Sequence, residues 1–151
     1  MEVLKLCRRN AVTIRPFEEL LTAARLMRER HVGYVVVVEP LFADGSHRPV
    51  GVLTDRDIIV KVFAREVDPR TLRVGDVMTR EPVTASATDS LSDALRSMRR
   101  LGVRRMPVVG VRGQLIGVLS MDEIIDALSG ELSDVAGSIR NEQRTEETLQ
   151  P

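Results

Sequence analysis

The sequence repeats itself, and this internal repeat restricts the folds open to the chain more than any other feature. The segment GVLTDRDII (residues 51–59) returns as GVLSMDEII (residues 117–125), 66 positions later. The segment VTIRPFEELLTAARLMR (residues 12–28) returns as VTASATDSLSDALRSMR (residues 83–99), 71 positions later. A repeat of this kind indicates two copies of one small structural unit. A ligand site built from repeated residues is therefore expected twice.

The two offsets differ, and the difference falls between Val38 and Val50. The first copy reads EPLFADGSHRP there, and the second reads GVRGQL. Gly, Pro, Asp and Ser are typical of turns, and surface loops tolerate changes in length at little entropic cost. We therefore predict that each copy contains a hairpin, and that the hairpin is longer in the first copy.

Each copy predicts the order strand, helix, strand, strand, helix. Apolar residues at i, i+3, i+4 and i+7 predict an amphipathic helix in both copies. These residues are Leu20, Ala23, Ala24 and Met27 in the first copy and Leu91, Ala94, Leu95 and Met98 in the second. Strands are expected at residues 11–14, 33–39, 49–54, 82–85, 104–110 and 114–120, and second helices at residues 55–66 and 121–129. Gly102 is expected to end the first helix of the second copy.

The pattern predicts a mixed α/β (α+β) fold, in which two β-α-β-β-α units pack with pseudo-two-fold symmetry and a C-terminal helix follows. We assign residues 1–66 to the first unit and residues 67–129 to the second, with a lead-in at residues 67–81. The segment VGDVMT (residues 74–79) aligns with residues 3–8, so each unit begins with a lead-in.

Residues 130–151 are expected to form a separate C-terminal helix and a frayed tail. Gly130 is expected to end the preceding helix. The next apolar set then predicts a helix over residues 131–143, with Leu132, Val135, Ala136 and Ile139 on one face. This helix would either pack on its own dimer or dock a partner.

Composition excludes several classes of function. Lys+Arg and Asp+Glu both number 22, which argues against nucleic acid or an anionic membrane as the partner. No apolar run approaches the roughly 20 residues of a membrane span. The single cysteine, Cys7, cannot form an internal disulfide, and His31 and His47 lack metal-ligand spacing. We expect a cytoplasmic protein without a metal site.

The repeated pattern G-x-x-[ST]-x-x-[DE] carries the sharpest functional signal, through Thr54 and Asp57 and again through Ser120 and Glu123. One interpretation is a capping box at a helix start. The other is a nucleotide cradle, because the glycine permits close approach, the helix N-terminus attracts anions and the carboxylate can accept ribose hydroxyls. The sequence leaves both interpretations open.

No motif of an enzyme active site is found. The G-x-S-x-G, Walker and G-x-G-x-x-G patterns do not occur. Acidic residues gather at the predicted helix starts, but no nucleophile or base accompanies them, so they are interpreted as caps. We expect a protein that is not an enzyme.

The order of elements and the segments GVLTDRD, GVLSMDE and RRMPVV resemble a tandem pair of CBS (cystathionine-β-synthase) domains, over about residues 3–128. The small stand-alone CBS-pair proteins of bacteria are the most similar type. The resemblance implies units packed sheet to sheet, with clefts that hold adenosine-containing ligands. Thr54 and Asp57 would contact ribose or phosphate in one cleft, and Ser120 and Glu123 in the other. The family usually has Asp where Glu123 stands, which changes the expected geometry.

The resemblance also implies phosphate contacts at Arg104 and Arg105, where the first copy has Gly33 and Tyr34. The alternative for the two arginines is a solvated charged pair at a strand start. The implied adenine pocket consists of Val12, Thr13, Val35, Val83, Thr84, Met106 and Pro107. The alternative for each of these residues is a place in the ordinary core.

We therefore expect a non-catalytic sensor or regulatory module that binds AMP, ADP, ATP or S-adenosylmethionine and requires no cofactor. It is expected to form a homodimer and to act on an unidentified protein partner. Two rival hypotheses remain. One is a structural dimerisation scaffold with vestigial clefts, and the other is an enzyme that acts on nucleotides.

Overall fold

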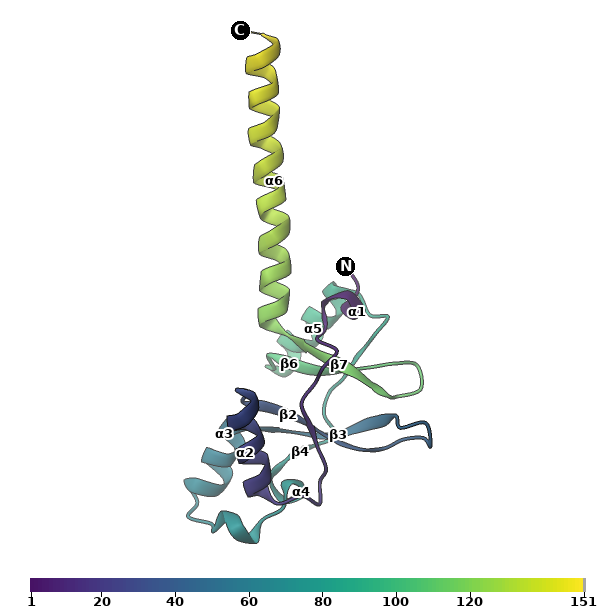
Figure 1. Ribbon diagram of the computed structural model, residues 1–151, viewed down its shortest axis with the longest axis vertical. Helices are drawn as coiled ribbons and strands as arrows, with labels where there is room; N and C mark the ends of the chain where they lie inside the picture. The colour runs from purple at the N-terminus through teal and green to yellow at the C-terminus, as the bar shows by residue number, and fades with distance from the viewer. Residues whose placement is uncertain (151) are drawn as a thin grey trace.

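The computed structural model describes residues 1–150 and contains the two units that the repeat predicts (Figure 1). The first unit comprises β1 (Thr13–Ile14), α2 (Leu20–Arg30), β2 (Tyr34–Pro40), β3 (His47–Thr54) and α3 (Asp55–Ile58), which continues as the π-helical segment η1 (Ile59–Phe63). The second unit comprises β5 (Ala85–Ser86), α5 (Leu91–Leu101), β6 (Arg105–Val109), β7 (Leu115–Ser120) and α6 (Met121–Leu149). The expected α+β fold is confirmed.

The two sheets repeat one another in direction and in register. β1 runs parallel to β2, which pairs with β3 in the antiparallel direction, and β5, β6 and β7 do the same. A β-bulge interrupts the first hairpin between Val37 and Val38 and recurs between Val108 and Val109. The length difference between the copies lies beyond this bulge, so the hairpin of the first copy is the longer one, as predicted.

Each unit buries the apolar helix face that its sequence predicts. Leu20, Ala23 and Met27 of α2 lie in the core of the first unit, and Leu91, Ala94 and Met98 of α5 lie in the core of the second. Gly102 ends α5 in the left-handed conformation, with φ of 66°. His31 holds the same place after α2 with φ of 55°.

Each lead-in segment packs against the core of the other unit. Helix α1 (Val3–Leu6) puts Val3 and Cys7 into the core of the second unit. The second lead-in contains η2 (Pro69–Thr71), α4 (Val74–Val77) and β4 (Thr79–Arg80), and it completes the core and the sheet of the first unit, whose strand order is β1-β2-β3-β4. The boundaries at residues 66 and 129 stay predictions, but the hydrophobic cores cross the first of them.

The recurring glycine is explained by a crossing backbone. Arg8, which follows α1, pairs with Val118 of β7 through two backbone hydrogen bonds of 2.9 and 3.0 Å. A Cβ atom at Gly117 would lie 2.1 Å from the Arg8 carbonyl oxygen, and one at Gly51 would lie 3.0 Å from that of Thr79. In both units the glycine therefore makes room for the lead-in of the other.

Tyr34 and Arg105 hold equivalent positions in the repeat and meet where the two units face one another. The Arg105 guanidinium carbon lies 5.7 Å from the centre of the Tyr34 ring. The Tyr34 hydroxyl is buried and has no hydrogen-bond partner among the described residues. Burial raises the pKa of Tyr34 well above its ordinary value, and the charge of Arg105 only partly opposes this.

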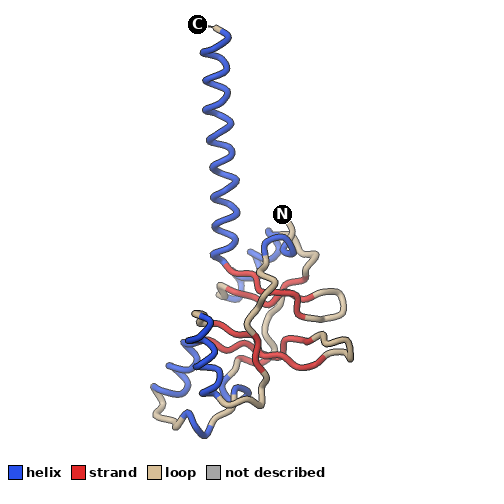
Figure 2. The backbone as a smooth tube through the Cα atoms, viewed as in Figure 1, coloured by secondary structure: helices blue, strands red, loops and turns tan. Residues whose placement is uncertain are grey.

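The C-terminal region differs from the prediction. Gly130 does not end a helix, and α6 runs without a break over 29 residues, from Met121 to Leu149. The predicted helix at residues 131–143 is the middle of this longer one. A glycine inside a helix costs about 1 kcal/mol relative to alanine, which does not end the helix unless a proline or a left-handed residue follows. Figure 2 shows α6 leaving the body as a single rod.

None of the helices in residues 1–150 has the length and hydropathy that crossing a bilayer would require.

We predict that Gly117→Ala lowers the free energy of unfolding by about 1–3 kcal/mol or more, because the new methyl group would overlap the Arg8 carbonyl. Urea denaturation measures this change. Gly130→Ala is the control for an added methyl group without overlap, since nothing lies within 4 Å of the added atom, and it should raise the free energy of unfolding by up to about 1 kcal/mol because it removes a helical glycine. Equal stability of Gly117→Ala and the parent would contradict the crossing described above.

We predict that the single tyrosine of the chain resists deprotonation in the folded protein. Because the pKa of Tyr34 is higher in the folded than in the unfolded protein, the neutral phenol contributes to the free energy of unfolding. This contribution is complete below the unfolded pKa of about 10 and is lost as pH rises beyond it. The protein has one tyrosine and no tryptophan, so phenolate absorbance reports Tyr34 alone. Native protein that forms phenolate at the same pH as denatured protein would contradict the prediction.

Candidate ligand-binding cleft

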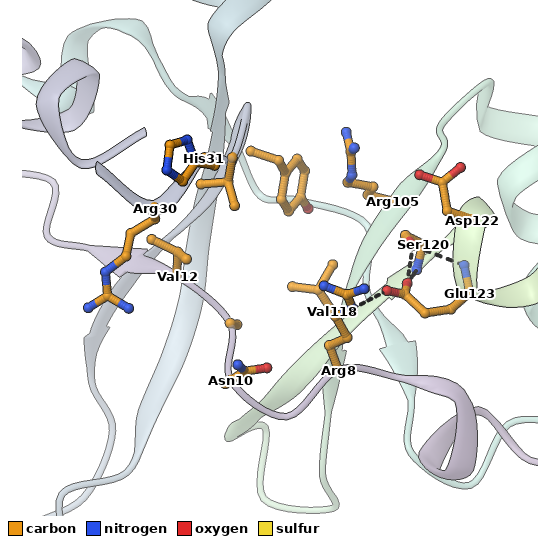
Figure 3. Close-up of a pocket in the computed structure, with 13 residues that line it drawn as sticks. Arg8, Asn10, Val12, Arg30, His31, Arg105, Val118, Ser120, Asp122 and Glu123 are labelled. Carbon is orange, nitrogen blue, oxygen red and sulfur yellow. Dashed lines mark hydrogen bonds and ion pairs between the residues drawn. The ribbon is translucent and has the colours of Figure 1, made fainter. Parts of the chain in front are cut away.

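A cavity of about 410 Å³ opens between the two units (Figure 3). One wall comes from the segment before β1, the end of α2 and the start of β2, and the other comes from the start of β6, from β7 and from the start of α6. The lining residues are Arg8, Asn10, Ala11, Val12, Arg30, His31, Val32, Tyr34, Arg105, Val118, Ser120, Asp122 and Glu123. The cavity therefore draws on both units and on the segment that joins them.

That joining segment, residues 8–12, supplies four of the lining residues. It runs from Arg8, which pairs with β7, to Val12, which precedes β1. Because one end of this segment lies beside each sheet, a ligand in the cavity would contact the segment that connects the two units.

Ser120 and Glu123 form a capping box at the start of α6. The Glu123 carboxylate accepts hydrogen bonds from the Ser120 backbone amide, at 3.1 Å, and from the Ser120 hydroxyl. The Glu123 amide in turn donates to the Ser120 hydroxyl oxygen. The other carboxylate oxygen lies 2.5 Å from Nε of Arg8, and Figure 3 marks this ion pair with a dashed line. Both oxygens of Glu123 thus have partners.

Thr54 and Asp57 form the same box at the start of α3, with both hydrogen bonds at 3.0 Å. Here the second carboxylate oxygen lies 3.2 Å from Nζ of Lys61 on the following turn. Neither Thr54 nor Asp57 lines the 410 Å³ cavity. The capping interpretation is therefore confirmed in both copies, whereas an open cavity adjoins the second one.

The arginines are placed around this cavity. Arg105 lines it and lies directly opposite Ser120 in the β6–β7 register. Arg104 borders an adjoining hollow of about 280 Å³, which Arg105, Ser120 and Asp122 also line. Arg30 enters the cavity from the end of α2, and neither Arg30 nor Arg105 makes an ion pair within residues 1–150.

The predicted adenine pocket is dispersed. Val12 lines the cavity, but Val35 and Met106 lie in the hydrophobic cores and Pro107 is buried. Thr13, Val83 and Thr84 are exposed and lie outside this cavity. Val32 and Val118 join Val12 as its aliphatic lining.

Several lining residues had no signal of their own in the sequence, namely Arg8, Asn10, Arg30, His31, Tyr34 and Asp122. The repeat contains a signal for Arg8, because Arg8 is the last residue of the repeated lead-in segment and the backbone of that segment needs hydrogen-bond partners in one of the sheets. Residues 1–150 contain no cluster of three His, Cys, Asp or Glu side chains placed to hold a metal ion.

The repeat offsets place different residues at the equivalent positions beside Thr54. Thr79, Glu81 and Leu101 correspond to Arg8, Asn10 and Arg30, and Arg56 corresponds to Asp122. The place of Glu123 is taken by Asp57. The cleft beside Ser120 is therefore the richer in positive charge.

Comparison with known proteins agrees with this architecture. The family model of the CBS domain matches residues 3–63 and 74–130. The chain is 32% identical over 123 residues to the CBS domain-containing protein YhcV of Bacillus subtilis, covering 81% of this chain and 82% of that one. An uncharacterized protein of Methanopyrus kandleri is 30% identical over 125 residues, which are 83% of this chain but only 61% of that longer protein.

A solved structure shares the arrangement of both units. The CBS domain protein of Pyrobaculum aerophilum in complex with AMP superposes with a TM-score of 0.71 at 27% identity, covering 82% of this chain and 89% of that one. The two matched segments, the shared fold and the intertwined lead-ins lead to one conclusion: the chain belongs to the CBS domain family and contains a tandem pair of these domains.

Proposed function

We propose that this CBS pair is a non-catalytic regulatory module that binds an adenosine-containing ligand in the cleft beside Ser120 and Glu123. The observation that carries the proposal is the 410 Å³ cavity, in which an acidic residue, unpaired arginines and aliphatic side chains converge. AMP, ADP, ATP and S-adenosylmethionine are the ligands considered. The Pyrobaculum aerophilum relative, which was solved with AMP, supports this ligand class.

The lining suits the three parts of such a ligand. Val12, Val32 and Val118 offer apolar surface to a purine, worth roughly 25 cal/mol per Å² buried. The Glu123 carboxylate can accept ribose hydroxyls. Arg105 and Arg30 can neutralise phosphate, and charge-assisted hydrogen bonds of this kind are among the stronger ones in proteins.

Binding of both ribose hydroxyls at Glu123 requires an exchange of partners. Oε2 already accepts two hydrogen bonds from Ser120 and Oε1 accepts one from Arg8, so the first hydroxyl can add to Oε1 and the second takes the place of Arg8. Arg8 is 76% exposed, and an ion pair this open to water contributes little stability. The exchange is therefore inexpensive, and it frees a guanidinium at the mouth of the cleft for the phosphate.

The charge difference between the clefts favours a single strong site for a phosphorylated ligand. Glu81 and Leu101 replace Asn10 and Arg30 in the second cleft. A phosphate there would meet the additional carboxylate of Glu81 and lack the guanidinium groups of Arg8 and Arg30, a loss that Arg56 at the place of Asp122 offsets only in part. We therefore propose that the second cleft binds such a ligand more weakly.

We also propose that the module works as a homodimer. Ile59, Val60 and Phe63 on the α3–η1 face are 59%, 47% and 81% exposed, and apolar side chains that lie together in this way favour association. Output to another protein would follow from a ligand-dependent shift in how the two units pack, limited by the difference in ligand affinity between the two arrangements.

Two rival functions are weighed against this proposal. A dimerisation scaffold with vestigial clefts is favoured by the capping role of Asp57 and Glu123. An enzyme acting on nucleotides is favoured only by the acidic residues at the helix starts.

We predict that one of AMP, ADP, ATP and S-adenosylmethionine stabilises the protein, by about 2.7 kcal/mol at 100 times its dissociation constant. Glu123→Ala should weaken binding at the tighter site by about tenfold or more, since it removes a charged hydrogen-bond acceptor. Thermal unfolding and calorimetric titration measure the two effects. Asp57→Ala is the matched control, because it removes the equivalent cap at the start of α3.

The outcomes separate the three functions. No stabilisation by any of the four ligands would favour the scaffold. A larger loss of affinity from Asp57→Ala than from Glu123→Ala would place the tighter site in the other cleft. A nucleotide that is converted during incubation would favour the enzyme.

A further inference from the structure

Helix α6 presents a continuous apolar stripe to solvent. Its members are Ile125, Leu128, Leu132, Val135 and Ile139, with exposed fractions from 40% at Leu128 to 70% at Leu132. Their spacing alternates between three and four residues, which is the heptad repeat of helices that pair along their length. The only residue of α6 that is fully buried is Ile124, near its start.

A helix of this composition has low intrinsic stability. Residues 129–138 contain Gly130, Gly137 and three serines, which are weaker helix formers than alanine. Isolated helices are marginally stable in water, and most helices in proteins depend on packing of an apolar face. The stripe is the face through which α6 can obtain that packing.

The charges beside the stripe fit an identical helix better than a charged partner. The flanking positions hold Ser129, Glu131, Ala136, Ser138, Gln143 and Thr145. Only one of these residues is charged, so two copies can approach closely without strong repulsion. The acids Asp126 and Asp134 lie away from the stripe.

The remaining charges favour an antiparallel pair. The stripe continues into Glu142 and Glu146. In a parallel pair each of these glutamates would face the same glutamate of the other helix, and the two like charges would repel. Residues 121–139 of α6 contain acidic residues and no basic one, whereas residues 140–149 contain Arg140 and Arg144, which partly offset three glutamates. A parallel pair would set the two strongly acidic parts side by side, and an antiparallel pair instead brings the arginines of each helix beside the acidic part of the other.

The length of the helix is sufficient for such a contact. A helix of 29 residues is about 43 Å long and about 10 Å wide, so two of them in contact would bury on the order of 1,000 Å². This lies at the lower limit for a specific protein interface. The expected association is therefore reversible.

We propose that α6 pairs with α6 of a second copy of this chain in the antiparallel direction, through the stripe from Ile125 to Ile139. With Leu132 of one copy opposite Val135 of the other, Leu128 lies opposite Ile139. This two-fold arrangement uses the same surface on both copies. It does not depend on whether a ligand occupies the cleft.

Disulfide cross-linking of single-cysteine substitutions tests both the pairing and its direction. Leu128→Cys mixed with Ile139→Cys should give a covalent dimer of the two variants, while neither variant alone should do so, because a disulfide requires Cα atoms within about 7 Å. Ser133→Cys mixed with Asp134→Cys is the matched control: the two positions are level in the pair but point outward. The native Cys7 is buried and is retained.

Each result supports or overturns the proposal. Self-linking of Leu128→Cys and of Ile139→Cys would show a parallel pair, and linking of the control pair as fast as the stripe pair would show random collision. Either result overturns the proposal.

Sedimentation provides an independent measurement. Leu132→Glu should weaken the association step that α6 mediates about tenfold or more, whereas Ser133→Glu, which adds the same charge, should leave it near the parent value, and any association through the α3–η1 face should be the same in both variants. Cleft-ligand affinity should be the same in both variants. A monomeric parent at high concentration, or equal association of the two variants, would contradict the proposal.

Discussion

The backbone pairing of Arg8 with Val118 is the contact on which the rest of the structure depends. It requires Gly117, because any side chain at that position would occupy the place of the Arg8 carbonyl. It puts α1 into the core of the second unit, while the next few residues start the first sheet. The two units are consequently interlocked, because each core contains side chains from the lead-in of the other. The same pairing places residues 8–12 along the cleft, so the connection between the units is also part of the candidate site.

The repeat was sufficient to predict the fold because its signals are local. Apolar periodicity predicted α2 and α5, and β-branched runs predicted β2 and β6. In all four elements the local preference for helix or strand agrees with the tertiary structure. The exchange of lead-ins could not be predicted, since alignment of residues 3–8 with 74–79 shows equivalence but not which sheet each segment completes. The predicted helix end at Gly130 is wrong for a related reason. A single glycine is a local signal, whereas the apolar spacing continues without interruption from Ile125 to Ile139 and favours one long helix.

The candidate site was predictable only in part. The repeated motif contains Ser120 and Glu123, which line the cavity, but it could not separate capping from ligand binding, because both uses need the same residue types at the same spacing. Nor could it show that Thr54 and Asp57 have different neighbours. That difference arises from residues distant in sequence, such as Arg8 and Arg30 against Thr79 and Leu101, and it appears only when the chain is folded.

Capping and ligand binding at Ser120 and Glu123 need not exclude one another. A carboxylate that already caps a helix is fixed in position, and a fixed acceptor loses less conformational entropy when a ligand binds. The helix that Glu123 caps is α6, so the cleft and the exposed stripe share one rigid element. The proposed pairing uses the stripe from Ile125 to Ile139, whereas the cavity uses only Asp122 and Glu123 of this helix, so the two proposed sites occupy different surfaces of one element and are expected to act independently.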